Sequence, residues 1–305
     1  MSEVITVGLD IAKHVFQVHG VDACGKAVVR RRLRRSEVLD FFEALEPCLV
    51  GIEACATSHH WARELLAMGH EVRLMPASYV KPYVKRQKND AADAEAICEA
   101  VTRPTMRFVP IKSVEQQSVL MAHRARELLI RQRTMTINAL RAHLAELGIV
   151  ARKGTNGSQL LMDLIEEDEE AYVPDAVRCA LLPLVRQIED LDTKIASLDE
   201  EISRWHRGSE ISQRLSTIPG VGPITASAIA ATVTDASLFR SGRELAAWLG
   251  LVPRQNSSGG KDRLGRITKK GDPYIRRLLV VGALSAIRVH RKNPQAMPWI
   301  GRLCE

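Results

Sequence analysis

The order of strand and helix signals in the first hundred residues constrains the fold more than any other feature of the sequence. Short apolar and β-branched runs predict strands at 4–10, 14–20, 26–33, 48–53 and 70–75. Helical spacing predicts helices at 36–45 and 58–68, and a third helix that begins near Asp90, where Asn89 can cap it. The short links 11–13 and 22–25 join the first three strands as an antiparallel meander. This β-β-β-α-β-α-β-α order predicts an α/β domain with a mixed sheet, as in RNase H-like folds.

The rest of the chain is mainly helical in composition. Residues 114–148 predict one long helix, and a later segment carries apolar residues at heptad spacing. These are Ile188, Leu191, Ile195, Leu198, Ile202 and Trp205. The seam fits two arrangements equally well: packing against helix 114–148 of the same chain, or a coiled coil between two subunits. We therefore expect three domains: an RNase H-like domain at 1–110, a helical coiled-coil arm at 111–208, and a mainly helical C-terminal domain at 209–305.

Charge and composition restrict the partners. The net charge of +7 favours a polyanion such as DNA, and an aromatic content of 4% argues against base stacking as the main contact. Six cysteines at irregular spacing favour reduced thiols over disulfides or zinc. The N-terminus does not resemble a signal peptide, and no apolar run is long enough to span a membrane. We expect a cytoplasmic, nucleoid-associated protein.

Four acidic residues fall at positions where the predicted fold can bring them together. Asp10 ends the first strand and Glu53 the fourth, while Asp90 and Asp93 lie one turn apart on the third helix. Taken singly, each is an ordinary turn, surface or helix-start acid. As an ordered set they would repel one another strongly without a cation, and carboxylate oxygens suit Mg²⁺. The set predicts a site for two Mg²⁺ ions, with Mn²⁺ as the alternative, in phosphoryl transfer.

A Pro-Gly-Val-Gly-Pro segment opens a helical region near residue 219. Gly220 and Gly222 allow a tight turn, and the amides at the start of the next helix can hold a phosphate without reading sequence. The segment resembles the helix-hairpin-helix of DNA-handling proteins, although an ordinary helix–helix turn is the alternative.

A basic stretch at 254–277 carries eight cations and only two acids, Asp262 and Asp272, which favours contact with a phosphate backbone. The cations are Arg254, Lys261, Arg263, Arg266, Lys269, Lys270, Arg276 and Arg277. Within it, Ser258 precedes two glycines, so that a phosphate could approach a serine hydroxyl beside cations. Ser-Ser-Gly-Gly is otherwise typical of a flexible turn. A second arginine run, 30–35, fits either a protected strand edge or a nucleic-acid patch.

Three segments, 7–20, 51–97 and 249–279, together resemble the one-ten/eleven-eleven class of bacterial insertion-sequence transposases. The resemblance implies a RuvC-like domain whose DEDD set is Asp10, Glu53, Asp90 and Asp93. It further implies a C-terminal transposase domain in which Ser258 attacks DNA and forms a phosphoserine link, with Ser257 as the fallback. Such proteins act on element ends and target DNA with a structured guide RNA. Because family members usually continue with further helices, this chain is expected to be shortened at its C-terminus.

The sequence thus predicts a DNA transposase or recombinase that is a homo-oligomer, a dimer or tetramer assembled through the coiled coil. Two alternatives remain: a two-metal, structure-specific endonuclease of the junction-resolvase kind, and a DNA-binding protein that has lost catalysis.

Overall fold

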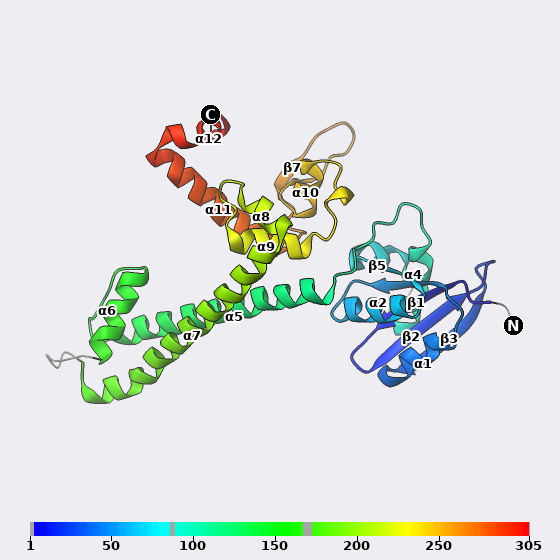
Figure 1. Ribbon diagram of the computed structural model, residues 1–305, viewed down its shortest axis with the longest axis horizontal. Coiled ribbons are helices and arrows are strands. Elements are labelled where there is room, and N and C mark those ends of the chain that lie inside the picture. Colours follow the sequence, from blue (N-terminus) through cyan, green and yellow to red (C-terminus); the bar gives the residue numbers. More distant parts are fainter. Residues whose placement is uncertain (1–2, 86–88, 167–172, 305) are drawn as a thin grey trace. The chain divides into compact units, whose positions relative to one another are not determined.

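The computed structural model describes residues 3–85, 89–166 and 173–304. The chain divides into two compact units, Met1–Val114 and Glu115–Glu305, which are described separately (Figure 1). Within the described residues, no helix is both long and apolar enough to cross a membrane.

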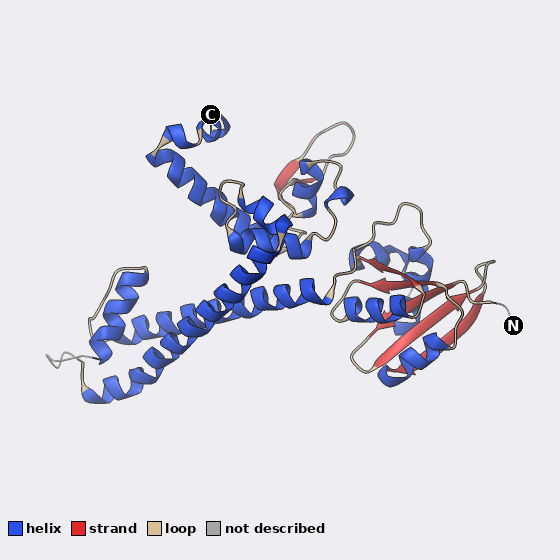
Figure 2. Cartoon of the chain, in the orientation of Figure 1, coloured by secondary structure: helices blue, strands red, loops and turns tan. Residues whose placement is uncertain are grey.

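The first unit is built on a five-stranded mixed sheet (Figure 2). Its strands are β1 (Thr6–Ile11), β2 (Val15–Val21), β3 (Ala27–Arg34), β4 (Leu49–Glu53) and β5 (Glu71–Met75). They lie in the order β3-β2-β1-β4-β5, with the β1–β2–β3 meander antiparallel and β4 and β5 parallel to β1. This mixed α/β architecture is consistent with the RNase H-like fold that the sequence predicts.

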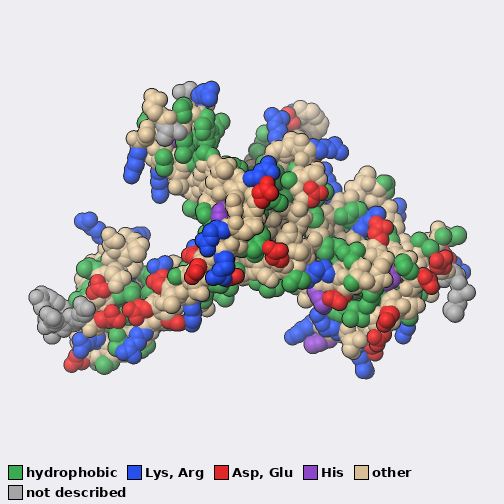
Figure 3. Space-filling view, in the orientation of Figure 1, with side chains coloured by type: hydrophobic (Ala, Val, Ile, Leu, Met, Phe, Trp, Pro, Cys, Tyr) green, Lys and Arg blue, Asp and Glu red, His purple; other side chains and the backbone are tan. Residues whose placement is uncertain are grey.

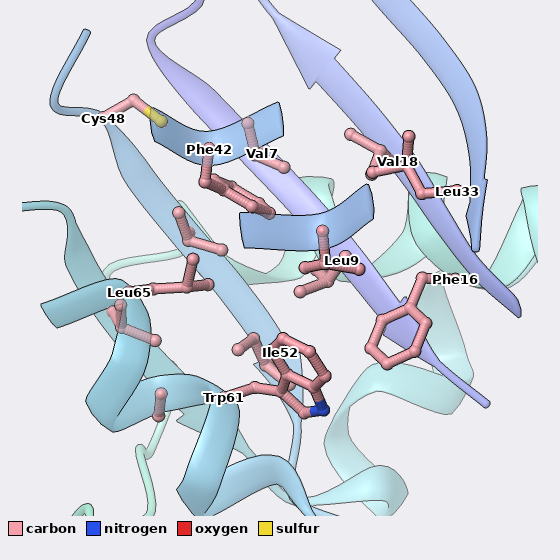
Figure 4. Packing of buried hydrophobic residues seen from close by; sticks show 14 of the residues in the cluster. Val7, Leu9, Phe16, Val18, Leu33, Phe42, Cys48, Ile52, Trp61 and Leu65 are labelled. Atoms are coloured by element: carbon pink, nitrogen blue, oxygen red, sulfur yellow. The ribbon is translucent and has the colours of Figure 1, made fainter. Parts of the chain in front are cut away.

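Helices cover both faces of the sheet, because its strands are apolar on both sides. Helices α1 (Val38–Glu43) and α2 (Ser58–Ala67) pack on one face, where Phe42, Trp61 and Leu65 meet the side chains of Leu9 and Ile52 (Figure 4). Helix α4 (Asp90–Val101) covers the other face, and α3 (Ala77–Val80) lies between β5 and α4 in the chain. As expected, Asn89 caps α4: its side-chain oxygen accepts a hydrogen bond from the backbone N–H of Ala92 at 2.8 Å.

Two glycines let α4 lie directly on the backbone of the sheet. Gly8 of β1 and Gly51 of β4 are paired in register. A Cβ atom at Gly8 would lie 2.1 Å from the carbonyl oxygen of Ala94, and one at Gly51 would lie 2.8 Å from the Cβ of Val101. The absence of side chains at these two points therefore sets the distance between α4 and the middle of β1 and β4.

The second unit contains two long helices, α5 (Val114–Ala145) and α7 (Asp175–Gly208), which run antiparallel (Figure 1). Arg126 forms an ion pair with Asp199, and Arg133 forms one with Asp192 at 2.7 Å. Four residues of the α7 seam are buried within the chain: Ile188, Leu191, Ile195 and Ile202. Helix α6 (Thr155–Glu166) packs against α5 and α7 at one end of the pair, and the buried residues there form one apolar cluster. Of the two arrangements that the seam allowed, packing within the same chain is present.

The remaining elements of the second unit form its C-terminal part. They are α8 (Glu210–Ser216), α9 (Pro223–Thr232), α10 (Gly242–Trp248), β6 (Pro253–Gln255), β7 (Leu264–Ile267), α11 (Pro273–Lys292) and α12 (Pro298–Cys304). A small apolar cluster joins α9, α10 and α11 through Ala228, Leu249 and Ile275. The antiparallel pair β6–β7 was not predicted from the sequence, because all of its residues are exposed and no alternation of apolar and polar residues marks it.

Candidate active site

Three of the four predicted acids converge at one edge of the sheet in the first unit. Asp10 lies near the end of β1, and Asp90 and Asp93 lie in the first turn of α4. One carboxylate oxygen from each of the three lies within 4.8 Å of those of the other two. Asp10 follows Gly8 by two residues and so faces α4, whose height above the sheet Gly8 sets. The close contact of α4 with β1 thus brings its first turn to Asp10.

Glu53 lies beside this trio on the neighbouring strand. It ends β4, whose Ile52 is paired with Leu9, so Glu53 comes next to Asp10 across the parallel pair. Its charge contributes to the raised pKa of Asp10, although its carboxylate is not one of the three whose oxygens lie within 4.8 Å of one another. The structure therefore brings the four predicted acids to one end of the sheet, three of them in close contact.

The electrostatics of the cluster are unfavourable for the protein alone. Burial and, to a smaller extent, the charges of Asp93, Asp90 and Glu53 together raise the pKa of Asp10 from 3.8 to about 6. A hydrogen bond with the backbone of Ile11 acts in the opposite direction but is outweighed. Clustered carboxylates of this kind are stabilised by a hard divalent cation, and the all-oxygen donor set fits Mg²⁺ or Mn²⁺. The residues present thus fit the metal that the sequence predicts.

One polar residue in this part of the sheet was not predicted from the sequence. Gln17 of β2 is paired directly with Asp10, so both side chains lie on the face that α4 covers. The signal was available, because the short link 11–13 between two strands fixes which residues stand opposite each other.

Ser258 lies in an exposed hairpin of the second unit, between β6 and β7. The N–H of Lys261 donates to the carbonyl oxygen of Ser258 at 3.1 Å, and the two glycines between them, Gly259 and Gly260, have φ of 57° and 74°. Positive φ at both central positions is what a two-residue hairpin turn requires. The two serines differ in their contacts: the N–H of Arg263 donates to the hydroxyl oxygen of Ser257 at 3.1 Å, whereas no hydrogen bond to the Ser258 hydroxyl is found within the described ranges.

The predicted cations divide into two groups. Most of those near the hairpin are exposed, and Figure 3 shows blue side chains at the outer end of the part that carries β7. They are Arg254, Lys261, Arg263, Arg266, Lys269 and Lys270. Arg276 and Arg277 lie instead on α11 and make internal contacts. The guanidinium of Arg276 donates to the carbonyl oxygens of Leu249 and Gly271, and Arg277 pairs with Glu127 at 2.8 Å.

The two glycines of the Pro-Gly-Val-Gly-Pro turn have different surroundings. Gly220 has a φ of 84°, and a Cβ there would lie 2.5 Å from the carbonyl oxygen of Gly282, so the turn packs directly on the backbone of α11. Gly222 precedes the first residue of α9, and a Cβ there would meet no atom within 4 Å. Gly220 therefore has a packing role, while the start of α9 at Gly222 is open.

A mixed sheet with clustered carboxylates at one end is consistent with the RNase H-like domain of a DNA transposase or recombinase. Residues 7–149 match the DEDD transposase model of IS110 elements, described as "Transposase". Residues 212–297 match the model described as "Transposase IS116/IS110/IS902 family". The chain belongs to this family of insertion-sequence transposases, as the resemblance predicted.

Similar proteins carry the same designation. A probable family 20 transposase of Pseudomonas aeruginosa is 50% identical over 92% of this chain and 84% of its own length. A putative transposase of Sinorhizobium fredii, y4pF/y4sB, is 45% identical over 98% of this chain and 78% of its own length. The transposase for insertion sequence element IS1111A of Coxiella burnetii is 38% identical over 100% of this chain and 84% of its own length.

Proposed function

We propose that this transposase cleaves and rejoins DNA strands with two parts that act together: a magnesium-dependent site formed by Asp10, Glu53, Asp90 and Asp93, and Ser258 as the nucleophile. The observation that carries the proposal is the convergence of the Asp10, Asp90 and Asp93 oxygens within 4.8 Å, with Glu53 on the adjacent strand. A bound divalent cation supplies stabilisation of negative charge on the reacting phosphate.

The residues of the chain have separate tasks in this reaction. The four carboxylates hold the cation, and the exposed cations around the hairpin bind the phosphate backbone and favour its approach to Ser258. The Oγ of Ser258 forms a bond to phosphorus, its proton is lost, and the bond from phosphorus to one deoxyribose oxygen breaks. Attack by a deoxyribose hydroxyl on the phosphoserine reverses these steps and joins the new strand.

The contacts of the two serines favour Ser258 over Ser257. The Ser257 hydroxyl accepts a hydrogen bond from the N–H of Arg263 and so takes part in holding the hairpin. Ser258 occupies the first position of the turn, beside two glycines that leave room for a phosphate.

Further parts of the proposal concern assembly and partners. We assign 1–110 to metal binding, 111–208 to a coiled-coil arm that also supports a dimer or tetramer, and 209–305 to strand transfer. The exposed turn at Gly222, where a Cβ would meet no atom within 4 Å, supports a helix-hairpin-helix contact with DNA at the start of α9. Family resemblance supports a structured guide RNA that selects the element ends and the target.

A denaturing gel tests the chemistry directly. The full chain is incubated with Mg²⁺, the non-coding RNA that flanks its gene, and labelled DNA that carries the element ends. We expect a covalent protein–DNA adduct that survives denaturation, disappears in Ser258→Ala and with EDTA, and persists in Ser257→Ala. Cleavage without an adduct would instead indicate a plain two-metal endonuclease. Neither cleavage nor adduct, with DNA binding retained, would indicate a DNA-binding protein that has lost catalysis.

A further inference from the structure

A hollow in the first unit lies between β2, β3 and the start of α4, next to the acidic cluster but outside it. Its volume is about 320 Å³. The polar residues that border it and enter the argument are Gln17, His19, Arg30, Arg32, Asn89 and Glu95. We call it the β2–β3 groove.

The strand register places this groove in line with the candidate metal site. Asp10 is paired with Gln17, and Gln17 is paired with Arg32, so the three side chains form one row across β1, β2 and β3. His19 and Arg30 form a second row one strand repeat away. Because side chains two residues apart share a face, Arg30 and Arg32 lie on the same face of the sheet as Asp10.

The arginines of the 30–35 run therefore lie in two different environments. Arg31 also borders the groove, but its guanidinium lies over the ring of Phe41 of α1, 5.7 Å from the centroid, and Arg35 lies over Trp61 at 5.1 Å. These two are held by aromatic rings of the opposite layer. Arg30 and Arg32 are exposed, and within 3–85, 89–166 and 173–304 neither forms an ion pair.

The charge of the groove favours an anion. It contains one acid, Glu95, which pairs with Lys85 at 2.8 Å. Protection of the sheet edge accounts for charged residues on β3, but a charge on either face would protect it equally. Edge protection therefore does not explain why two cations that form no ion pair within the described part of the chain line up with Asp10.

We propose that the β2–β3 groove binds the phosphodiester backbone of the nucleic-acid strand that enters the metal site. Arg30 and Arg32 stand about 6.7 Å apart along the strand, so they can contact neighbouring phosphates, and the Gln17 amide can donate to a phosphate oxygen beside Asp10. The contact is to the backbone, so it does not depend on base sequence. This inference rests on the proposed metal-dependent function. The experiments below distinguish a failure of the groove proposal from a failure of the metal-site proposal.

The salt dependence of binding tests the two arginines. Binding of fluorescent single-stranded DNA and of RNA of the same sequence is measured on the full chain with Ca²⁺ at several salt concentrations. For Arg30→Gln combined with Arg32→Gln we expect the slope of log affinity against log salt to fall by about 1.4, at about 0.7 per phosphate contact. The neighbouring variant Arg31→Gln is the matched control, and its slope should equal that of the unaltered chain. Equal slopes in all three proteins, or an equal fall in Arg31→Gln, would overturn the proposal.

Comparison of the two oligonucleotides identifies the source of the backbone. A loss confined to DNA indicates the scissile strand, a loss confined to RNA indicates the guide, and an equal loss indicates that either strand is bound through its phosphates. Each result supports a phosphodiester site in the groove.

A photo-crosslinking experiment separates this proposal from that of the metal site. A benzophenone amino acid at position 32 should crosslink to the labelled strand, whereas the same amino acid at position 31 should not. Mn²⁺ binding is measured in parallel by its electron paramagnetic resonance signal on the unaltered chain and on Asp10→Asn. Crosslinking at position 32 without Mn²⁺ binding would contradict the proposed metal site and support the proposed phosphate contact in the groove. If Asp10→Asn abolished Mn²⁺ binding but crosslinking were equal at positions 31 and 32, only the proposal for the groove would be contradicted.

Discussion

The Asp10 side chain is partly buried beside three other carboxylates, and this environment raises its pKa from 3.8 to about 6. The folded protein thus binds a proton here that the unfolded chain has already released. Between about pH 4 and pH 6 the free energy of unfolding contributed by this group falls as pH rises, and above about pH 6 the full penalty is present. A cation that binds the carboxylates offsets that penalty.

Substitution of Asp10 should therefore separate stability from activity. In EDTA at pH 7.5, we expect Asp10→Asn to raise the free energy of unfolding by about 1–3 kcal/mol, because the amide cannot ionise. The same variant should lose metal-dependent strand cleavage. Urea denaturation with and without Mg²⁺ measures both effects on stability, and the gain should shrink when Mg²⁺ is added to the unaltered chain. At pH 4 the two proteins should be equally stable, and a stabilisation that persisted there would contradict the explanation.

At the scale of elements, the position of α4 depends on Gly8 more than on any side chain. A Cβ at this position would lie 2.1 Å from the carbonyl oxygen of Ala94 and 2.4 Å from the backbone N of Cys98, so α4 would have to move away from β1. We expect Gly8→Ala to lower the free energy of unfolding by about 1–3 kcal/mol and to weaken Mn²⁺ binding, because Asp90 and Asp93 move with the helix. Chemical denaturation and Mn²⁺ titration measure the two effects.

A suitable control is Gly242→Ala, at a glycine where a Cβ would meet no atom within 4 Å and whose φ is not positive. It should leave both quantities within about 0.5 kcal/mol of the unaltered chain. If Gly8→Ala lowered stability but left Mn²⁺ affinity intact, then α4 would not be the element that positions the acids.

The elements that could be predicted from the sequence are those whose pattern of buried residues is local. The five strands of the first unit and the cap at Asn89 follow from periodicity and from short links, and the row from Asp10 to Gln17 follows from the same meander. The partner of the α7 seam could not be predicted, because heptad spacing is the same for any facing helix. Ion pairs such as that of Arg133 with Asp192 identify α5 as the partner helix of α7, but these residues lie far apart in the chain.

Contacts made by backbone alone were also beyond the sequence. Gly220 and Gly282 lie so close that a Cβ at either would overlap the other's carbonyl oxygen, and neither glycine has a local signal that names its partner. Likewise, the arginine run at 30–35 is continuous in the sequence, but the structure divides it into arginines that lie over aromatic rings and arginines that are exposed. Its division depends on which face each residue takes, and the position of Arg31 over Phe41 became apparent only with α1 in place.

At the scale of the whole molecule, the chain consists of two compact units with separate cores, and each contains a group that responds to a different condition. We expect the first unit to respond to divalent cations through its carboxylates. The second contains His123 of α5, which is 1% exposed and lies between α9 and α11. Its two ring nitrogens lie 3.1 Å from the hydroxyl of Ser227 and 2.9 Å from that of Tyr274.

His123 should make the second unit sensitive to acid. Burial lowers the pKa of His123 from 6.5 to about 4, so the unfolded chain takes up a proton that the folded unit refuses. The free energy of unfolding therefore declines as pH falls below about 6.5, by about 2 kcal/mol at pH 5, and the loss is complete below about pH 4. Because the units have separate cores, we expect two calorimetric transitions. Acid should lower the transition temperature of the second unit, and the decrease should be larger in the unaltered chain than in His123→Gln. The glutamine can still hydrogen-bond but cannot be protonated.

Addition of Mg²⁺ at one hundred times its dissociation constant should raise only the transition temperature of the first unit, by the equivalent of about 2.7 kcal/mol. A single transition that responded to both acid and Mg²⁺ would mean that the units unfold together, so that metal binding at the carboxylates also stabilises the helices that carry the serine hairpin.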